Sequence, residues 1–387
     1  MNTNKIKLAD IIQRVSETNK ELMLTNKELV LGISIDKEFM PSVANLNGTD
    51  LSKYSVLRKN RFAYNPMHVG RDERLPIALY RSNEVALISP AYEMFEIKPD
   101  SQIDLDYLML VFKTSWFDKA CWFYTDSSVR GGLSYNDFCN IEIELPSLDE
   151  QQKLVRQYNT IVNRIDVLKR LNENLFNTIN VVWNNKFSCI RKYLAGEDAD
   201  LNQYTVTKMK ELYNIEIGRT PPRENMNYFS KTNGLKWVSI ADMNPIKHFI
   251  SNTKECLTTF AQNDFKIKII PQNSVLLSFK MTIGRVLITT ENMYSNEAIA
   301  SFQNVGDDLY FLYMYLKNFD YVTLGNTSSI TTAVNSTIVK NMLFIRPSNN
   351  EILEFNRFAT PIFNNIKVNE REIERLNSLK QLLVTSL

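Results

Sequence analysis

The sequence predicts an α+β protein in which two related globular parts are joined by two long antiparallel helices, with a pseudo-two-fold internal repeat. Three observations support this fold class. The chain repeats itself at an offset of 201 residues, two long segments carry apolar residues at helical spacing, and the rest consists of short strand-like runs broken by Pro, Gly and Asn. A chain of 387 residues is long enough for two or three ordinary hydrophobic cores, and the duplication indicates two.

The repeat is clearest in residues 127–175 and 328–376, which align without a gap and are identical at 14 of 49 positions. The offset becomes 204 at two helical segments, residues 104–113 and 308–317, and 213 at two Ser-Asn-Glu sequences. Length changes therefore fall in the globular parts, because loops tolerate them better than packed helices do. The expected organisation is a first globular domain at residues 1–147, a long helix at 148–195, a linker and second globular domain at 196–348, and a second long helix at 349–387.

The two long segments are expected to be helices that pair with each other. No Pro or Gly occurs between residue 148 and Gly196, and apolar residues recur at helical spacing in both segments. A helix of this length, roughly 55 to 70 Å, needs a partner for its apolar stripe. Antiparallel pairing would relate the two copies by a local two-fold axis and place the globular parts at opposite ends of a rod. Pro361 should kink or interrupt the second helix near its start.

Composition and motifs exclude several classes of protein. The 45 Lys and Arg nearly balance the 43 Asp and Glu, so the net charge of +2 indicates neither an acidic nor a basic partner. No apolar run has the length of a signal peptide or a membrane span, and the four dispersed cysteines indicate reduced thiols in a cytoplasmic protein. Because only two histidines are present and phosphate-loop, nucleophile-elbow and H-E-x-x-H motifs are missing, we expect no catalytic site and no metal site.

Several loops carry side chains that are suited to DNA. Arginine can bind phosphate or read a guanine edge with two hydrogen bonds. A solvated surface loop explains any one of these residues, but equivalent loops in both copies keep the same chemistry while the surrounding sequence diverges. In the second copy the candidate DNA-binding residues are Arg219, Thr220, Arg223, Lys280, Thr282, Arg285, Asn326, Thr327 and Ser328. In the first copy they are Tyr64, Asn65, His68, Arg71, Arg74, Ser128 and Arg130.

Three motifs follow one another along the chain. They are a P-S-x-x-E-Q-Q helix start at 146–152, a G-x-T-P loop at residues 218–221 followed by LKWVSIADM, and the sequence SFKMTIGRV at 278–286 followed by SNEAIASF. In this order, and together with the duplication and the long helices, they resemble the specificity subunits of type I restriction-modification systems over nearly the full chain. The first globular part lacks the G-x-T-P loop, and the second helix lacks Glu-Gln-Gln. The two domains thus look like different sequence subtypes that read different half-sites.

The resemblance implies a DNA-recognition subunit without catalytic activity or a cofactor of its own. Each globular part would be a target recognition domain that reads one half of a split, asymmetric double-stranded sequence, and the paired helices would fix the gap between the halves. The family also implies two methyltransferase subunits, which dock on the helices and use S-adenosylmethionine to methylate adenine. Motor-nuclease restriction subunits that use ATP and Mg would cut unmodified DNA.

Two other classes of function were weighed against this one. A scaffold with two protein-interaction domains on a helical rod would have the same layout and no DNA contact. Basic and polar residues at equivalent loops favour the DNA reader over the scaffold. An enzyme is the least supported class, because the nucleotide, metal and nucleophile motifs are missing.

Overall fold

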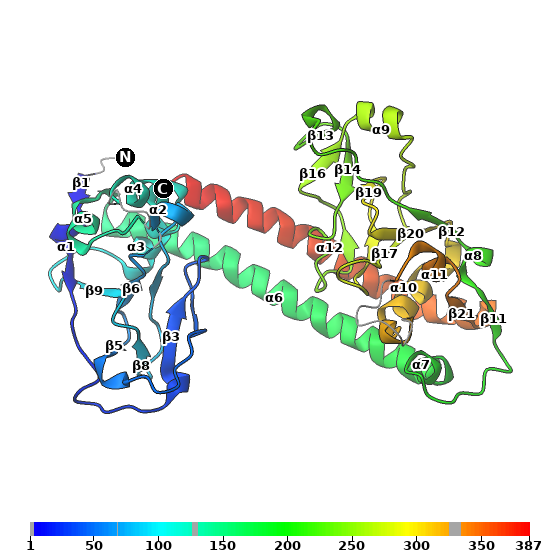
Figure 1. Cartoon of the computed structure of the whole chain (residues 1–387), viewed down its shortest axis with the longest axis horizontal. Coiled ribbons are helices and arrows are strands. Elements are labelled where there is room, and N and C mark those ends of the chain that lie inside the picture. The colour runs from blue at the N-terminus through cyan, green and yellow to red at the C-terminus, as the bar shows by residue number, and fades with distance from the viewer. Residues whose placement is uncertain (1–3, 68, 126–130, 325–333) are drawn as a thin grey trace. The chain divides into compact units, whose positions relative to one another are not determined.

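The α+β class is confirmed by the computed structural model, which describes residues 4–67, 69–125, 131–324 and 334–387 (Figure 1). The chain divides into two compact units. Unit 1 comprises Met1–Arg164 and Leu376–Leu387, and unit 2 comprises Ile165–Arg375. Each unit therefore contains one globular part together with portions of two long helices. Within the described ranges, no helix combines the length and the apolar character that a membrane crossing requires.

Both long helices begin at the predicted positions, and they begin in the same way. Helix α6 spans Leu148–Lys186 and helix α12 spans Asn349–Thr385. Ser147 precedes α6, and its amide donates to Glu150 at 3.3 Å while its Oγ accepts from the Glu150 amide at 3.4 Å. Ser348 and Glu351 repeat this arrangement ahead of α12, with distances of 2.9 and 3.3 Å. These are capping boxes, which satisfy amides that the first turn of a helix leaves without partners.

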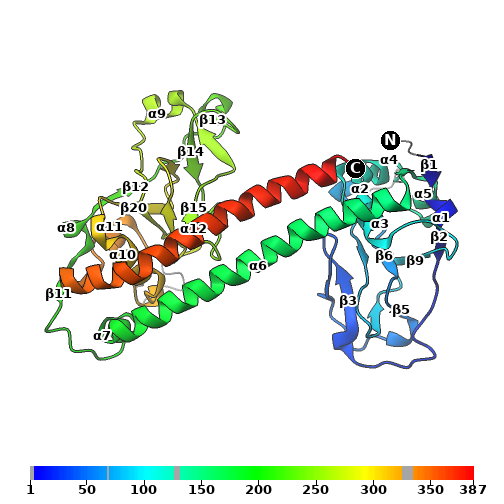
Figure 2. The same ribbon diagram turned by 180° about the vertical axis from the view of Figure 1, so that it is seen from behind.

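In unit 2 the two helices pair in antiparallel fashion, as expected (Figure 2). Near the end of α6, Lys186 forms an ion pair of 2.6 Å with Glu354 near the start of α12. Further back along α6, Asn172 accepts a hydrogen bond of 2.8 Å from Asn369, which lies further along α12. The buried apolar residues of the two helices in this unit are Ile165, Leu168, Ile179, Trp183, Ile352, Phe355, Ala359, Phe363, Ile366 and Ile373.

Two details of the helices differ from the expectation. The first helix does not continue to residue 195, because Phe187 leaves helical geometry (φ −111°, ψ 42°) and a separate helix α7 spans Ser188–Leu194. The second helix is not interrupted at Pro361, which lies inside α12. A proline in a helix removes one backbone hydrogen bond. Fully buried Ala359 and Phe363, on either side of it, hold this part of α12 against the core of unit 2.

The repeat is visible in the strands that flank each globular part. In unit 1, β1 (Asn4–Lys7) pairs in antiparallel fashion with β10 (Glu142–Leu145). In unit 2, β11 (Thr205–Lys208) pairs in antiparallel fashion with β21 (Leu343–Arg346). All four strands are related by the offset of 201 residues that the sequence shows, so the two units share this ladder in the same register.

Unit 1 contains two four-stranded sheets in addition to this ladder. The first sheet is antiparallel and has the order β2 (Ile12–Arg14), β9 (Glu93–Ile97), β6 (Phe62–Tyr64) and β7 (Ile77–Leu79). The second has the order β4 (Phe39–Pro41), β3 (Val30–Ile33), β8 (Ala86–Ile88) and β5 (Ser55–Leu57), and β3 runs parallel to β8.

In the described part of unit 1, five α-helices accompany these sheets, besides the portions of α6 and α12. They are α1 (Leu8–Ile11), α2 (Val69–Asp72), α3 (Leu105–Phe112), α4 (Ser115–Phe123) and α5 (Tyr135–Asn140). Short 3-10 turns lie at η1 (Lys27–Leu29) and η2 (Leu51–Lys53). Side chains at the N-caps of α3, α4 and α5 accept amide hydrogen bonds, which favours a helix start at each point.

A buried ion pair joins the β3–β4 hairpin of unit 1 to helix α4. Lys37 adopts a left-handed conformation (φ 65°) in the hairpin turn, and its Nζ lies 2.6 Å from Asp118 Oδ1. The same ammonium donates to the carbonyl of Phe112, and Asp118 also accepts from the amide of Leu75 at 3.0 Å. Burial lowers the pKa of Lys37, while the negative charge of Asp118 acts in the opposite direction. Such a pair is costly to break, because one charge would remain buried without its partner.

Unit 2 contains a five-stranded and a four-stranded sheet. The five-stranded sheet has the order β12 (Asn214–Ile217), β20 (Ile299–Gln303), β17 (Val275–Ser278), β18 (Val286–Thr289) and β15 (Phe249–Ile250). The four-stranded sheet has the order β13 (Phe229–Ser230), β16 (Glu255–Leu257), β14 (Leu235–Val238) and β19 (Tyr294–Ser295). The shorter helical elements are α8 (Met209–Leu212), α9 (Thr259–Phe265), α10 (Leu309–Lys317), α11 (Ser336–Lys340), η3 (Met226–Tyr228), η4 (Gly306–Asp308) and η5 (Tyr321–Leu324).

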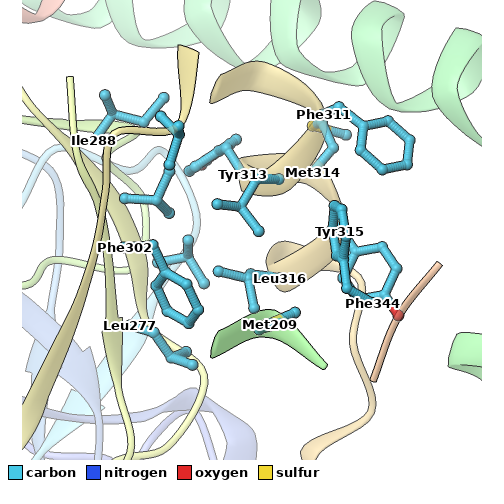
Figure 3. Close-up of a cluster of buried hydrophobic side chains, with 14 of the residues drawn as sticks. Met209, Leu277, Ile288, Phe302, Phe311, Tyr313, Met314, Tyr315, Leu316 and Phe344 are labelled. Atoms are coloured by element: carbon cyan, nitrogen blue, oxygen red, sulfur yellow. The ribbon is translucent and has the colours of Figure 1, made fainter. Parts of the chain in front are cut away.

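The core of unit 2 forms between helix α10 and the five-stranded sheet. Six consecutive residues of α10, from 311 to 316, are fully buried. Figure 3 shows Tyr313, Met314 and Leu316 facing side chains of the strands, among them Leu277 and Phe302. A helix that is apolar on all sides must be covered on all sides, and here the sheet, the long helices and β21 cover it. Its position holds the sheet at a defined place on the helix pair within this unit.

Candidate nucleic-acid interface

Three loops of unit 2 meet at one end of its five-stranded sheet. Strand β12 ends at Ile217, which pairs with Ala300 near the start of β20, and Ser278 at the end of β17 pairs with Ile299. Because these neighbours are antiparallel, the loop after β12, the loop before β20 and the β17–β18 turn lie at the same sheet end. We call this region rim 2 and define it as residues 218–223, 279–285 and 295–298. Six of the nine candidate residues of the second copy belong to rim 2.

The first loop of rim 2 is held in place by a close backbone approach at Gly218. A Cβ at this position would lie 2.2 Å from the carbonyl oxygen of Ser295, so only glycine fits. The next amide, that of Arg219, donates to the same Ser295 carbonyl at 2.9 Å, and Trp237 Nε1 donates to the carbonyl of Arg219 at 3.1 Å. The side chain of Arg219 is exposed, and its Nη1 donates to the carbonyl of Phe265 at 2.9 Å. The loop therefore presents a guanidinium at the surface in a defined position.

Thr220 and Arg223 are also exposed, and both have partners within the chain. The hydroxyl of Thr220 donates to the carboxylate of Glu297. The guanidinium of Arg223 pairs with Glu255 at 2.8 Å and lies 4.2 Å from the ring centroid of Phe229. Exposed ion pairs are worth little in stability, so a phosphate could compete for the guanidinium of Arg223 at small cost.

The β17–β18 turn carries two predicted residues, Lys280 and Thr282, whose side chains extend into solvent. Lys280 and Thr282 are exposed, and Met281 between them is 94% exposed with φ 60°. Gly284 has φ 86°, and a Cβ there would lie 2.9 Å from the ring of Tyr321. The turn is closed by Ser278, whose amide donates to the carbonyl of Arg285 at 2.9 Å. This arrangement projects an ammonium, a hydroxyl and an apolar side chain together into solvent.

Arg285 lies in the same turn, but its side chain is directed into the protein. Its Nη1 donates to the carbonyls of Ile240 at 2.9 Å and Met243 at 3.2 Å, and the residue is half-buried. The guanidinium thereby ties the turn to the segment that links β14 to β15. The structure thus supports a positioning role for Arg285, with the two carbonyls as its partners.

The equivalent end of the first sheet of unit 1 carries a longer loop between β6 and β7, residues 65–76. This loop meets residues 131–133, because the Gly70 amide donates to the carbonyl of Gly131 at 2.9 Å and the Leu133 amide donates to that of Pro66 at 3.0 Å. The two glycines touch, and a Cβ on Gly131 would lie 2.5 Å from the Cα of Gly70. We define rim 1 as residues 65–76 and 131–133.

Tyr64, the last residue of β6, is a core residue and does not belong to the surface of rim 1. It is fully buried and stacks on Phe138 with a centroid distance of 4.6 Å. Its hydroxyl has no hydrogen-bond partner among the described residues, and burial raises its pKa. Its place at the end of a buried strand explains the difference from the expectation, since an aromatic beside a polar loop can face either way.

The other described candidates of the first copy lie on rim 1. Asn65 is half-buried, and its side chain accepts from the amide of Met67 at 2.9 Å, which shapes the turn. Arg71 is exposed and forms a two-bond pair with Asp72, at 2.7 and 2.9 Å. Arg74 is exposed as well. The remaining candidates lie outside the described residues: His68, Ser128, Arg130, Asn326, Thr327 and Ser328.

Inspection of the sequence missed a polar cluster on α12 of unit 2. Glu370 is 7% exposed, and burial raises its pKa to about 7. Its carboxyl group accepts hydrogen bonds from the backbone amides of His248 at 2.8 Å and Phe249 at 3.0 Å. A signal was present, because Glu370 falls within the apolar spacing formed by Phe363, Ile366 and Ile373. A carboxyl at a core position indicates a specific partner.

Metal ligation has no candidate in the described part of the chain, where no group of three or more His, Cys, Asp or Glu side chains could hold an ion. Rim 2 carries cationic, hydroxyl and amide groups together with the carboxylate of Glu297, and rim 1 carries cationic and amide groups beside the carboxylates of Asp72 and Glu73. Chemically, cationic, hydroxyl and amide groups bind phosphate and base edges.

Comparison with known proteins finds a family match in the second half of the chain. Residues 202–378 match the family described as "Type I restriction modification DNA specificity domain". The type I restriction enzyme HindI specificity subunit of Haemophilus influenzae is 27% identical over 186 residues, which cover 46% of this chain and 39% of that protein. The type I restriction enzyme MjaIX specificity subunit of Methanocaldococcus jannaschii is 20% identical over 308 residues, which cover 75% of this chain and 70% of that protein.

A solved structure shows the same fold over the whole chain. The S subunit of a type I restriction-modification system from M. genitalium aligns with 100% of this chain and 96% of its own, with a TM-score of 0.57 and 12% identity. The chain therefore shares the fold of this S subunit. Together with the family match, this confirms the resemblance to type I restriction-modification specificity subunits that the motif order indicates.

Proposed function

We propose that the chain is the non-catalytic DNA-recognition subunit of a type I restriction-modification complex. It reads a split, asymmetric target, with one half-site per globular part, and directs adenine methylation or restriction by partner subunits. The observation that carries the proposal is the gathering of exposed cationic and polar side chains at the same sheet end in both units. In unit 2 this sheet end lies within the region matched by the DNA specificity family.

The two rims support an asymmetric target because their chemistry differs. Rim 2 presents Arg219, Lys280 and Thr282 on short, tightly closed loops. Rim 1 presents Arg71 and Arg74 on a longer loop that lacks the G-x-T-P sequence. Arg and Lys contacts to phosphates would position each domain, and contacts to base edges would specify the sequence.

Partner subunits are expected on the long helices. Several apolar side chains of α6 and α12 are 43% or more exposed, so they do not pack within their own unit and are free to contact a partner. They are Val167, Leu171, Val181, Val368, Leu379 and Leu382. We infer that two methyltransferase subunits cover them and supply S-adenosylmethionine chemistry. Motor-nuclease subunits would supply the ATP- and Mg-dependent steps, and the complex would act in the cytoplasm.

The test is to map methylated adenines in a host that carries the chain together with its methyltransferase subunits. A split motif with two different halves and a gap of a few base pairs is expected, and a continuous palindrome would refute the proposal. Arg219→Ala combined with Lys280→Ala should reduce methylation of every occurrence of the motif. The matched control is Lys210→Ala, because Lys210 is exposed in α8, which precedes β12 and lies at the opposite end of the strand from rim 2. Unchanged methylation in the double variant would favour a scaffold that does not contact DNA.

A further inference from the structure

Two carboxyl groups of helix α12, those of Glu370 and Glu374, bind one segment of the second globular part. The Glu370 carboxyl accepts the backbone amides of His248 at 2.8 Å and Phe249 at 3.0 Å. One turn further along the helix, Glu374 pairs with Lys247 at 2.7 Å and accepts from Ser251 Oγ at 2.8 and 2.9 Å. We call Glu370 and Glu374, with residues 247–251, the α12 clamp. All of its members belong to unit 2.

Aromatic contacts from both long helices enclose the same segment. The ring of Phe176 on α6 lies 4.2 Å from the ring of His248, and His248 Nδ1 is 2.8 Å from the hydroxyl of Tyr313 on α10. On the other side, Phe249 meets Phe363 of α12 edge to face at 6.3 Å. The segment 247–251 is therefore oriented by α6, α10 and α12 together.

The gripped segment leads directly to rim 2. It contains β15, whose residues Phe249 and Ile250 pair with Ile288 and Thr289 of β18. Strand β18 begins one residue after Arg285, the residue that ties the β17–β18 turn to the carbonyls of Ile240 and Met243. A rotation of β15 relative to α12 would thus be passed to Lys280 and Thr282 through one pair of strands.

The buried carboxyl of Glu370 is better suited to orienting segment 247–251 than to stabilising the contact between this segment and α12. An apolar residue at position 370 would continue the stripe of Phe363, Ile366 and Ile373 and would bury apolar area without a buried carboxyl. Two amide donors on one carboxyl group fix an angle as well as a distance, because hydrogen bonds weaken steeply when bent. At the equivalent positions of α6, 201 residues earlier, Lys169 and Glu173 are both exposed. The clamp is therefore a property of one copy of the repeat.

From this geometry we propose that Glu370 and Glu374 are positioning residues that set the angle of the second globular part on the helix pair, and thereby the gap between half-sites that the subunit accepts. The proposal rests on the function proposed above. One base-pair step moves a half-site by about 3.4 Å and rotates it by about 35°. A shift of that size at β15 would lengthen the clamp bonds well beyond the limit of about 3.2 Å for N–H donors. An intact clamp thus resists a gap that is one base pair too long or too short.

The experiment uses the complete complex of the chain with its methyltransferase subunits. Once the wild-type motif is mapped, a plasmid carries the same half-sites at the mapped gap and at gaps one and two base pairs longer or shorter. Methylation at each gap is measured for the wild type, for Glu370→Gln with Glu374→Gln, and for the control Lys169→Gln with Glu173→Gln. The clamp variant should raise the ratio of off-gap to mapped-gap methylation by about tenfold, since a misplacement of 1 Å in a reacting group costs up to about a hundredfold. The control should keep the wild-type ratio.

A merely structural role predicts a different outcome. Loss of stability would lower methylation at all gaps equally, and an unchanged ratio in a clamp variant would overturn the proposal. If the double variant does not fold, Glu374→Gln alone is measured. Glu374 and its partner Lys247 are 27% and 35% exposed at the side chain, so this loss is tolerated more easily. The ratio should then move in the same direction by a smaller factor, and a constant ratio would reject the clamp.

The clamp and the proposed function can fail separately. A wild-type complex that methylates no split motif would refute the function before any variant is measured. In that event hydrogen exchange in the assembled complex still tests the clamp, because the amides of His248 and Phe249 donate to Glu370. Both amides should exchange faster in Glu370→Gln than in the control variant. Equal exchange would show that the carboxyl does not hold this segment.

Discussion

Arg285 and Lys280 lie five residues apart in one turn, yet replacement by alanine should affect them in different ways. The guanidinium of Arg285 is half-buried and donates to two carbonyls, at 2.9 and 3.2 Å. Hydrogen bonds from charged donors contribute about 1.5 to 3 kcal/mol each in buried surroundings, and partial exposure reduces this. Arg285→Ala should therefore lower the free energy of unfolding by about 2 kcal/mol.

Lys280 is exposed, so Lys280→Ala should change the free energy of unfolding by less than about 0.5 kcal/mol. A lysine that neutralises one phosphate instead contributes about 0.9 to the slope of log affinity against log salt. We expect Lys280→Ala to reduce this slope by about that amount and to weaken binding to target and non-target duplexes alike.

The assay combines two measurements. Urea unfolding followed by circular dichroism gives the change in stability, and fluorescence anisotropy of the assembled complex on labelled duplex between about 50 and 200 mM salt gives the slope. Lys210→Ala serves as the control in both. If Arg285→Ala kept wild-type stability and lost slope, its guanidinium would bind phosphate, and the assignment to Ile240 and Met243 would be refuted. A wild-type slope for Lys280→Ala would remove this residue from the interface.

Three further predictions concern stability. Lys37→Met should lower the free energy of unfolding by about 3 to 5 kcal/mol, because it leaves Asp118 buried without its cation, and Lys37→Met with Asp118→Leu should recover part of the loss in calorimetry. The pKa of Glu370 is raised to about 7, so the folded state binds a proton more tightly than the unfolded state does. The free energy of unfolding should therefore fall as pH rises from about 4.5 to 7. Glu370→Gln should remove roughly 3 kcal/mol of that decline, measured by urea titrations at several pH values. Gly218→Ala should cost about 1 to 3 kcal/mol, since its Cβ would meet the Ser295 carbonyl oxygen at 2.2 Å, and an unchanged melting temperature would contradict this geometry.

The sequence predicted the helices well because their signals are local. Ser147 and Ser348, each followed by a glutamate three residues later, mark both starts, and the apolar spacing marks the buried face. The effect of Pro361 was overestimated, because the local cost of a proline does not include the packing of Ala359 and Phe363 around it. Strand pairing could not be predicted from local signals, since partners such as β12 and β20 are far apart in the chain.

The candidate interface could be predicted as a set of loops but not residue by residue. Composition indicated cationic and polar loops, and the structure brings two of those of the second copy, residues 218–223 and 279–285, to one sheet end. It did not indicate that Tyr64 faces the core or that the guanidinium of Arg285 is occupied by two carbonyls. The side to which a loop residue points depends on neighbours that are distant in sequence. Glu370 could have been found, since a carboxyl in an apolar heptad is a local signal.

The composition of unit 1 has a consequence for the order in which the protein can fold. This unit needs Leu376–Leu387, and Leu387 packs against its hydrophobic core, which otherwise comes from the first 164 residues. During synthesis, all segments of unit 2 are available once residue 375 has emerged from the ribosome, whereas unit 1 must wait for residue 387. The half that is made first is therefore completed last.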